Sequence, residues 1–406
     1  MAARKLRLGV AGLGRGFMMM LPTISRHPRV EVVAAADPRP EARDRFAADF
    51  GGRTYESVDA LCADDGVDAV YLATPHQYHA DNVVAAARGG KHALVEKPMA
   101  VTLAECDVMI AAARHARVHL LVGHSHSFDA PILRTRELID SGAVGEVRMI
   151  TAAYYTDFLY RPRRPEELDT ARGGGVVFSQ GAHQVDIVRL LAGGMARSVR
   201  AIAGAWDPAR RTEGAYSALM TFADGAFASL TYSGYAHFDS DELMGWIGEL
   251  GQRKDPQRYG AARAQTGRPM SPEEESALKA TRSYGMARDS FAQPDAHNHF
   301  GQIVVSCDRA DLRPMADGVF VYGDDARHFE TIAPPAIPRA EVIDELADAI
   351  DGVRAPVHTG DWARATLEAC LAMLESSRRG AEVALTQQVA LPARPPARAP
   401  ETTGVR

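Results

Sequence analysis

The first residues whose spacing could do chemistry are glycines near the N-terminus. Gly12, Gly14 and Gly16 stand between a short apolar run and a helical pattern that includes Arg15 and Phe17. After a strand and at the start of a helix, such glycines can bind a dinucleotide. Gly12 would allow the tight turn, and Gly14 would let the backbone approach a pyrophosphate at the helix N-terminus. The third fingerprint position holds Phe17, so we expect looser helix–strand packing there. An isolated match is more often a plain glycine-rich turn.

A carboxylate at Asp37 argues for the dinucleotide. Asp37 ends the second expected strand, 23 residues after Gly14, where it could accept hydrogen bonds from both adenosine ribose hydroxyls. It would repel a 2′-phosphate, so the sequence predicts NAD as cofactor, with NADP less favoured. Arg39 could still neutralise such a phosphate. Asp37 could also cap the helix that begins near Pro40.

The elements that must position these residues alternate between short apolar runs and helical patterns up to about Gly123. This alternation is typical of βαβ units with a parallel sheet. A helix is expected after Thr102, which has capping-box spacing to Glu105, and another at 40–50. The expected strands are 6–11, 30–36, 69–74, 92–95 and 118–122.

The second half of the chain has a different pattern. After an expected helix at 131–141, longer β-like segments predict an α+β domain with an open, mainly antiparallel sheet. They are 147–155, 215–222, 226–232, 301–306 and 319–322. The stretch 239–299 is polar and indicates an insertion of loops and short helices, which in compact domains is often functional.

We therefore expect three parts: an NAD-binding domain at 1–125, a substrate and oligomerisation domain at 126–385, and a disordered tail at 386–406. An amphipathic helix at 362–379 closes the second domain, and the tail is rich in Pro, Ala and Arg. A length of 406 residues fits two hydrophobic cores.

Composition restricts the class of partner. The net charge of −6 leaves no basic surplus for nucleic acid. The four cysteines lie far apart, without the spacing of a disulfide framework or a thiolate zinc site. No signal-peptide pattern precedes the first strand, and no apolar run is long enough for a membrane span. We expect a cytoplasmic protein that acts on a small molecule.

Several motifs together resemble those of the Gfo/Idh/MocA oxidoreductase family. The resemblance covers nearly the whole chain and is specific only when the motifs are taken together. They are Gly12 to Phe17, Ala73-Thr74-Pro75 with His76 and His79, Glu96-Lys97-Pro98, the turn from Ser141 to Gly145, Gly173 to Gly175 followed by His183 and Asp186, and a closing helix at 356–376. It implies a Rossmann domain, and it places Thr74, Pro75, His79, Glu96 and Lys97 at the cofactor.

The resemblance also implies the catalytic residues. In that family the lysine of Glu-Lys-Pro reaches the substrate hydroxyl and the nicotinamide, and a histidine after the glycine run takes part in proton transfer. The matching residues are Lys97 and His183. Oxidation of an alcohol releases a proton as hydride leaves, and a desolvated lysine has its pKa lowered toward neutrality. Without the resemblance, Lys97 would be a solvated charge and His183 a histidine on a helix face.

One position departs from the family. Members commonly carry an Asp four residues before the histidine, where this chain has Ser179. Ser179 can still form hydrogen bonds, and Asp186 lies one helical turn after His183, where it could orient the imidazole. The division of roles between Lys97 and His183 therefore stays open.

Within the family, the chain is most similar to the phthalate 4,5-cis-dihydrodiol dehydrogenases, at 123–129, 154–165, 178–180 and 304–307. Oxidation of such a diol gives a hydroxy-dienone that tautomerises to a catechol. Arg161, Arg163 and Arg164 lie in one loop, and forked guanidiniums suit carboxylates. A solvated loop paired with Glu166 and Glu167 is the alternative. The expected substrate contacts are His124, His126, Tyr155, Arg161, Arg163, Arg164, Ser179 and His183.

No metal is expected. His124 with His126, and His297 with His299, are interpreted as polar contacts, since no cluster of acids or cysteines accompanies them. Two further functions stay open: a sugar or inositol dehydrogenase using the same lysine and histidine, and a sensor that binds the dinucleotide without turnover. The resemblance also implies a homo-oligomer, a dimer or tetramer, built through the open sheet.

Overall fold

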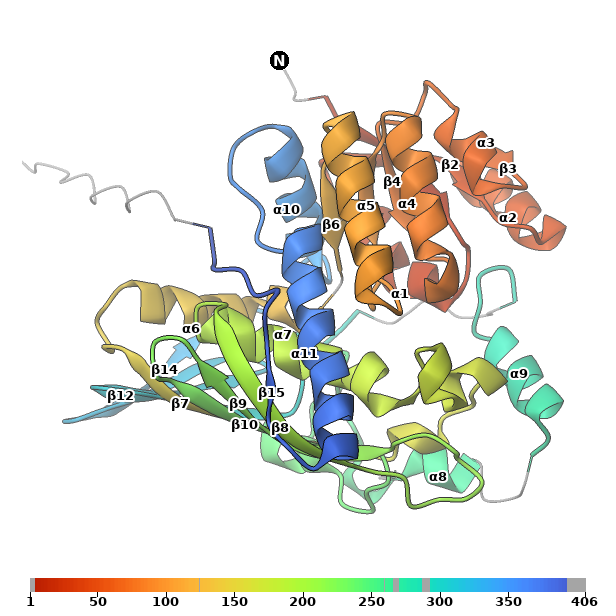
Figure 1. The fold of residues 1–406 in the computed structure, drawn as a ribbon. Helices are drawn as coiled ribbons and strands as arrows, with labels where there is room; N and C mark the ends of the chain where they lie inside the picture. The colour runs from red at the N-terminus through yellow and green to blue at the C-terminus, as the bar shows by residue number, and fades with distance from the viewer. Residues whose placement is uncertain (1–3, 124, 259, 266–269, 287–292, 393–406) are drawn as a thin grey trace, which may run out of the picture.

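The computed structural model describes residues 4–123, 125–258, 260–265, 270–286 and 293–392. Two sheets organise the chain, a six-stranded sheet in the N-terminal part and a nine-stranded sheet in the rest (Figure 1). Within the described residues, none of the helices combines the length and apolar character that a membrane span requires.

The N-terminal sheet is parallel throughout, with strand order β3-β2-β1-β4-β5-β6. This is the doubly wound order of dinucleotide-binding domains, whose ligand crevice lies outside the carboxyl ends of the strands where the order reverses, here between β1 and β4. The strands are β1 (Leu6–Ala11), β2 (Val30–Ala36), β3 (Arg53–Tyr55), β4 (Ala69–Leu72), β5 (His92–Val95) and β6 (Leu120–Val122). The helices are α1 (Arg15–Ile24), α2 (Pro40–Phe50), α3 (Val58–Cys62), α4 (His79–Arg88) and α5 (Leu103–Ala116).

The predicted Rossmann domain is confirmed strand by strand, with two differences. β4 and β6 are each two residues shorter than expected, and the edge strand β3 was not predicted, because three residues are too few for an alternating pattern. The capping box of α5 forms as expected: the Thr102 hydroxyl accepts from Glu105 N, and the Glu105 carboxylate accepts from Thr102 N.

The second sheet has the order β14-β13-β12-β11-β7-β10-β9-β8-β15 and is antiparallel except between β7 and β10. The prediction of an open, mainly antiparallel sheet is confirmed. Its strands are β7 (Val147–Tyr155), β8 (Ala196–Gly204), β9 (Ala215–Phe222), β10 (Phe227–Ser233), β11 (Gln302–Cys307), β12 (Ala310–Met315), β13 (Gly318–Gly323), β14 (Arg327–Thr331) and β15 (Val383–Ala384).

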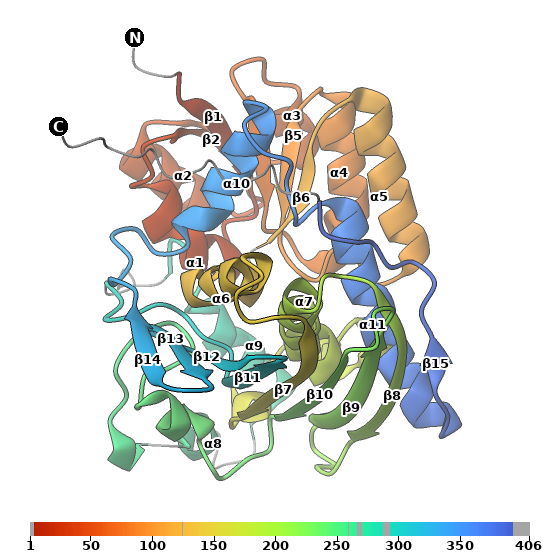
Figure 2. The ribbon, with the colours of Figure 1, turned by 90° about the vertical axis from the view of Figure 1, so that its left-hand side faces the viewer.

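Helices cover one face of this sheet and leave the other exposed. α6 (Ala130–Asp140) packs on β12 and β13, α7 (Ala182–Leu191) on β7 and β10, and α11 (Gly360–Arg379) on β8. Figure 2 shows α6 and α7 between the sheet and the N-terminal domain. Burial therefore alternates along the strands, as expected when only one face carries the core.

The chain returns to the first domain near its end. α10 (Ala340–Ile350), which was not predicted, buries Val342, Ile343 and Leu346 in the same apolar cluster as Leu8 and Val10 of β1. α11 then packs on α5 and α7. These last two helices thus join the two domains. The domain boundary near residue 125 stays a prediction.

The polar insertion consists of loops and short helices, as predicted: 3-10 turns at Ser240–Met244 and Pro256–Arg258, α8 (Ala261–Gln265) and α9 (Pro272–Ala280). Its Tyr284 reaches the glycine loop, where it donates its N–H to Leu13 O and packs edge-on against Phe17 at 5.0 Å. Phe17 is fully buried, so the expected looser packing is not found.

The described part of the predicted tail is hydrogen-bonded to the second domain. Thr386 N and Gln387 N donate to the Glu368 carboxylate, and the Gln388 side chain accepts from Arg189 Nε at 2.8 Å. The expected disorder is therefore wrong for 386–392, where paired polar groups hold the chain. Residues 393–406 lie outside the described residues.

Candidate active site

The glycine loop has the geometry that a pyrophosphate requires. Gly12 has φ +88°, and a Cβ there would lie 2.8 Å from Ala73 O, so the tight turn excludes a side chain. A Cβ on Gly14 would meet nothing within 4 Å. α1 begins at the next residue without a side-chain cap, which leaves its first N–H groups for an anion. This part of the chain therefore fits a dinucleotide.

The cleft over this loop contains most of the predicted cofactor residues. They are Gly12, Gly14, Arg15, Gly16, Asp37, Thr74, Pro75, His79, Glu96 and Lys97. Phe17 packs in the core behind the loop. α9 of the insertion contributes Ser276, Lys279 and Ala280 to the same cleft.

Asp37 holds the glycine loop and a neighbouring arginine. One of its oxygens accepts from Leu13 N at 2.7 Å, and the other accepts from Arg39 N at 2.9 Å and Arg39 Nε at 3.0 Å. Arg39 in turn donates to Leu13 O at 2.8 Å. The guanidinium that could meet a 2′-phosphate is thus drawn back onto the carboxylate.

His79 joins the loops that follow β4 and β5. Its Nε2 lies 3.0 Å from Thr74 O and its Nδ1 lies 3.1 Å from Pro98 O, and burial lowers the pKa of the ring. His79 therefore fixes the loop that carries Lys97. Glu96, the residue before Lys97, accepts a 2.5 Å hydrogen bond from Tyr71 Oη.

Lys97 projects from the end of β5 toward the second domain. The Lys97–Pro98 peptide bond is cis. The Lys97 amine donates to Ser179 O at 2.9 Å, and burial lowers the pKa of Lys97, against the opposing charges of Glu96 and Glu249. A buried amine with a lowered pKa releases its proton more readily than a solvated lysine does.

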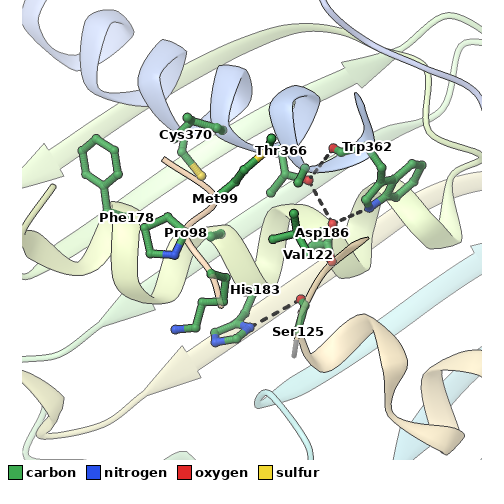
Figure 3. A pocket seen from close by; sticks show the side chains of 14 residues that line it. Pro98, Met99, Val122, Ser125, Phe178, His183, Asp186, Trp362, Thr366 and Cys370 are labelled. Carbon is green, nitrogen blue, oxygen red and sulfur yellow. Dashed lines mark hydrogen bonds between the residues drawn. The ribbon is translucent and has the colours of Figure 1, made fainter. Parts of the chain in front are cut away.

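His183 lies across the same cleft, on the first turn of α7. The ring is 3% exposed, and its Nδ1 lies 3.5 Å from Ser125 Oγ (Figure 3). It packs against the rings of His126 at 4.7 Å and Phe300 at 5.0 Å. Lys97 and His183 line two adjoining cavities together, so the structure brings the two predicted catalytic residues to one place.

Asp186 and the Ser179 hydroxyl, which were expected to support His183, have other hydrogen-bond partners. Asp186 Oδ1 accepts from Trp362 Nε1 at 2.5 Å and from Thr366 Oγ1 at 2.9 Å, as Figure 3 shows, and its Oδ2 accepts from Ser127 Oγ. Asp186 therefore ties α11 to α7 and does not orient the imidazole. The Ser179 hydroxyl also turns away, donating to Gly175 O at 2.5 Å, so only its carbonyl serves the site.

The cavity on the open side of Lys97 and His183 has a volume of about 280 Å³ and a positive lining. Six cationic side chains face it against three carboxylates, a balance that favours an anionic ligand. The cations are Arg15, Lys97, Arg161, Arg163, Lys279 and Arg282, and the acids are Glu96, Glu167 and Glu249.

Two of the three predicted arginines lie in this cavity. Arg163 stacks on Phe158 at 3.7 Å and donates to Phe158 O, and burial lowers its pKa to about 10. Its buried Nε has no hydrogen-bond partner within the described part of the chain. Arg161 lies 3.3 Å from Glu249. Burial disfavours the charge of Arg161, but Glu249 together with Tyr232, Tyr154 and Asp157 outweighs burial and raises the pKa of Arg161.

Ser179 and His183 also line this cavity, whereas Arg164, Tyr155 and His126 do not. Arg164 lines the dinucleotide cleft and is ion-paired with Glu166 at 3.1 Å. Tyr155 lies on the outer face of the nine-stranded sheet, beside Phe238, because neighbouring residues on a strand face opposite ways and Tyr154 takes the inner face. His126 contacts His183, and His124 lies outside the described residues.

The insertion was expected to be functional, but sequence reasoning did not single out which of its residues reach the site. Glu249, Lys279 and Arg282 all reach the cavity, although they lie in the polar stretch that precedes β11. Charged residues in a polar segment look like ordinary surface, so the sequence carried no signal for them. Phe158, which supports both arginines, was also not singled out.

His297 and His299 show no metal-site geometry. His297 Nε2 lies 2.8 Å from Ala333 O, and His299 Nε2 lies 2.8 Å from Ile247 O, so both bond to the backbone. Among the residues that the structure describes, no group of three or more potential ligand side chains could hold a metal ion.

Comparison with known proteins assigns the family. The model of the oxidoreductase family with an NAD-binding Rossmann fold matches residues 6–124, and that of the GFO/IDH/MocA C-terminal domain matches 132–252. The chain belongs to the Gfo/Idh/MocA family. It is thus an oxidoreductase that uses a nicotinamide cofactor, which confirms the resemblance seen in the sequence.

Two similar proteins match along almost the whole chain. The 1-carboxy-3-chloro-3,4-dihydroxycyclohexa-1,5-diene dehydrogenase of Comamonas testosteroni is 50% identical over 377 residues, which are 92% of this chain and 95% of that protein. A crystal structure of a putative dehydrogenase from Bordetella bronchiseptica superposes with a TM-score of 0.89 at 41% identity, covering 94% of this chain and all of the other.

More distant relatives act on polyols and sugars. The inositol 2-dehydrogenase of Rhizobium meliloti is 29% identical over 61% of this chain and 74% of its own length. A levoglucosan dehydrogenase structure covers 94% of this chain and 99% of its own, with a TM-score of 0.70 at 18% identity, a likeness that shows the fold alone.

We expect Lys97→Ala to lower kcat by about 10²- to 10⁴-fold, the usual contribution of an acid–base group. NAD binding should stay nearly unchanged, because the substitution leaves the glycine loop intact. Steady-state kinetics would be compared with a fluorescence titration of NADH. A variant that keeps more than about a third of wild-type kcat would exclude Lys97 from proton transfer.

Proposed function

We propose that the protein oxidises a carboxylated cyclohexadiene cis-dihydrodiol to the corresponding catechol, with NAD as the acceptor. The observation that carries the proposal is the cationic cavity beside Lys97 and His183. The guanidinium groups of Arg161 and Arg163 in its lining give a carboxylate a place to bind while the diol faces Lys97 and His183. The 50% identical relative is named for a substrate with the same carboxyl and diol groups.

The proposed reaction is balanced without a metal. Bound NAD would take the carbinol hydrogen as hydride. Lys97 and His183 are the groups placed to take the hydroxyl proton, and the Ser179 carbonyl keeps the Lys97 amine pointed into the cleft. The resulting hydroxy-dienone becomes a catechol by tautomerisation, so aromatisation draws the reaction forward. One NAD is reduced and one proton is released per diol.

The neutral-polyol alternative fits the cavity less well. A sugar or inositol would bring no negative charge to a lining in which cationic side chains outnumber carboxylates. A sensor without turnover would have no need for a lysine of lowered pKa beside a histidine. Both alternatives predict that the arginines do not distinguish charged from uncharged diols.

We expect Arg163→Ala, and to a lesser degree Arg161→Ala, to lower kcat/KM for a carboxylated dihydrodiol by about one to two decades, the value of a charge-assisted hydrogen bond. Most of the loss should be in KM, and lysine should rescue only partly, because a point charge cannot reproduce the fork.

Arg164→Ala is the matched control, since Arg164 belongs to the same loop but lines the dinucleotide cleft. Any loss in this variant should be equal for a carboxylated and an uncharged dihydrodiol. If Arg161→Ala and Arg163→Ala also lose efficiency equally on the two substrates, the loop is structural and the carboxylate proposal fails.

We further propose that NAD is preferred over NADP, because Asp37 faces the cofactor cleft and holds Arg39. Asp37→Ser should raise kcat/KM for NADP about tenfold or more, as Arg39 becomes available to a 2′-phosphate. Adding Arg39→Ala should remove that gain. Equal efficiency of the wild-type protein with both cofactors would contradict the preference.

The outer face of the nine-stranded sheet is the proposed oligomer interface. It exposes apolar side chains from neighbouring strands, namely Met149, Ile202, Leu219 and Phe227. Apolar groups gathered on one face are typical of an association surface. Light scattering should give the mass of a dimer or tetramer, and Leu219→Arg should lower it. A monomeric wild-type protein at working concentration would overturn this proposal.

A further inference from the structure

His126 is a buried imidazole held between two carboxylates. Its Nδ1 lies 2.6 Å from Asp129 Oδ2, and its Nε2 lies 3.8 Å from Glu249 Oε1. The ring is 1% exposed. Burial alone would lower the pKa of His126, but Asp129 and Glu249 outweigh it and raise that pKa. His126 is therefore positioned to hold a positive charge inside the site.

This charge lies against the catalytic histidine. The rings of His126 and His183 meet edge to face with centroids 4.7 Å apart, and Phe300 packs against both at 5.0 Å. A cation at that distance disfavours protonation of His183, since like charges repel strongly in a buried site. His183 is thus kept ready to accept a proton.

Glu249 links the same histidine to the substrate cavity. Its second oxygen lies 3.3 Å from the guanidinium of Arg161, and Glu249 lines the cavity with Arg161, Lys97 and His183. Both contacts of Glu249 are long, so neither partner holds it tightly. The residue comes from the insertion, and it stands between the carboxylate anchor and the proton-accepting pair.

We propose that Glu249 and His126 are positioning residues that couple carboxylate binding at Arg161 to proton transfer at Lys97 and His183. In a family whose members commonly place an Asp before this histidine, Ser179 leaves that position without a carboxylate. The charged group against His183 is instead the His126 cation, which is flanked by Asp129 and by Glu249 of the insertion. The carboxylate part of this inference rests on the proposed function.

The two residues act on the catalytic pair with opposite sign. His126 carries a positive charge beside His183 and lowers the tendency of His183 to hold a proton, whereas Glu249 carries a negative charge and raises the pKa of Lys97. His126 keeps its proton without Glu249, because Asp129 remains at 2.6 Å. The charged groups that face this cluster are Glu96, Lys97, Asp129, Arg161, Arg163, Arg15, Arg339 and Glu249.

The test is the pH dependence of kcat for the full chain with saturating NAD. The acidic limb of this pH profile, where kcat falls as the pH is lowered, reports the group that must be unprotonated in the bound complex. We expect His126→Gln to move this limb to higher pH and Glu249→Gln to move it to lower pH, each by about one pH unit.

A second readout concerns the carboxylate. Glu249→Gln should lower KM for a carboxylated dihydrodiol roughly two- to fivefold, because the substrate no longer competes with Glu249 for Arg161. KM for an uncharged dihydrodiol should not change. The matched control is Glu242→Gln, the same change at an exposed position of the insertion, which should leave both the limb and KM in place.

Circular dichroism and NADH titration would show that each variant is folded and binds the cofactor. If His126→Gln does not fold, Glu249→Gln alone decides. Unmoved limbs in folded variants, or shifts of the same sign, would overturn the inference. If the wild-type protein oxidises only neutral polyols, the proposed function fails, and the limb shifts measured on that polyol still decide whether His126 and Glu249 act on the catalytic pair.

Discussion

The hydrogen bond from the Lys97 amine to the Ser179 carbonyl joins the two domains at the reacting centre. Lys97 ends a strand of the dinucleotide-binding sheet, and Ser179 belongs to a π-helical turn, Val177–Gly181, that leads into α7. A π-turn shifts the backbone pairing of a helix and is often found at functional sites. The buried amine has a partner and a fixed direction, and His183 follows four residues later on the same segment.

This contact requires that the domains keep a fixed relation, and buried polar groups at the end of the chain provide it. Asp186 on α7 binds Trp362 and Thr366 of α11. His358, just before α11, lies 3.0 Å from Glu345 of α10 and 2.8 Å from Ser127. Since unsatisfied polar groups are costly when buried, separating these elements would be penalised at each of them. The chain thereby fixes α7 against the sheet that carries Lys97.

The insertion contributes charged side chains to the cavity between the two domains. The dinucleotide loop, Lys97 and His183 belong to the regular elements or the turns directly beside them, whereas Glu249, Lys279 and Arg282 come from a segment of loops and short helices. Phe158 holds Arg163 by stacking, a contact that orients the guanidinium without neutralising it. A cavity built in this way keeps its positive charge while its arginines stay ordered.

The sequence by itself determined the class of the protein. The spacing of Gly12, Gly14 and Asp37 and the alternation of strands and helices were enough for the fold, because these depend on local backbone chemistry and short-range periodicity. The family, and the prediction of Lys97 and His183 as catalytic residues, came from the resemblance of several motifs taken together. Tertiary structure alone decided that Asp186 supports α11, that Tyr155 faces outward, and that Glu249 reaches His126 across more than a hundred residues of chain. Such pairings depend on how separate elements pack, and a hydrogen-bonding side chain carries no local mark of which distant partner the fold will give it.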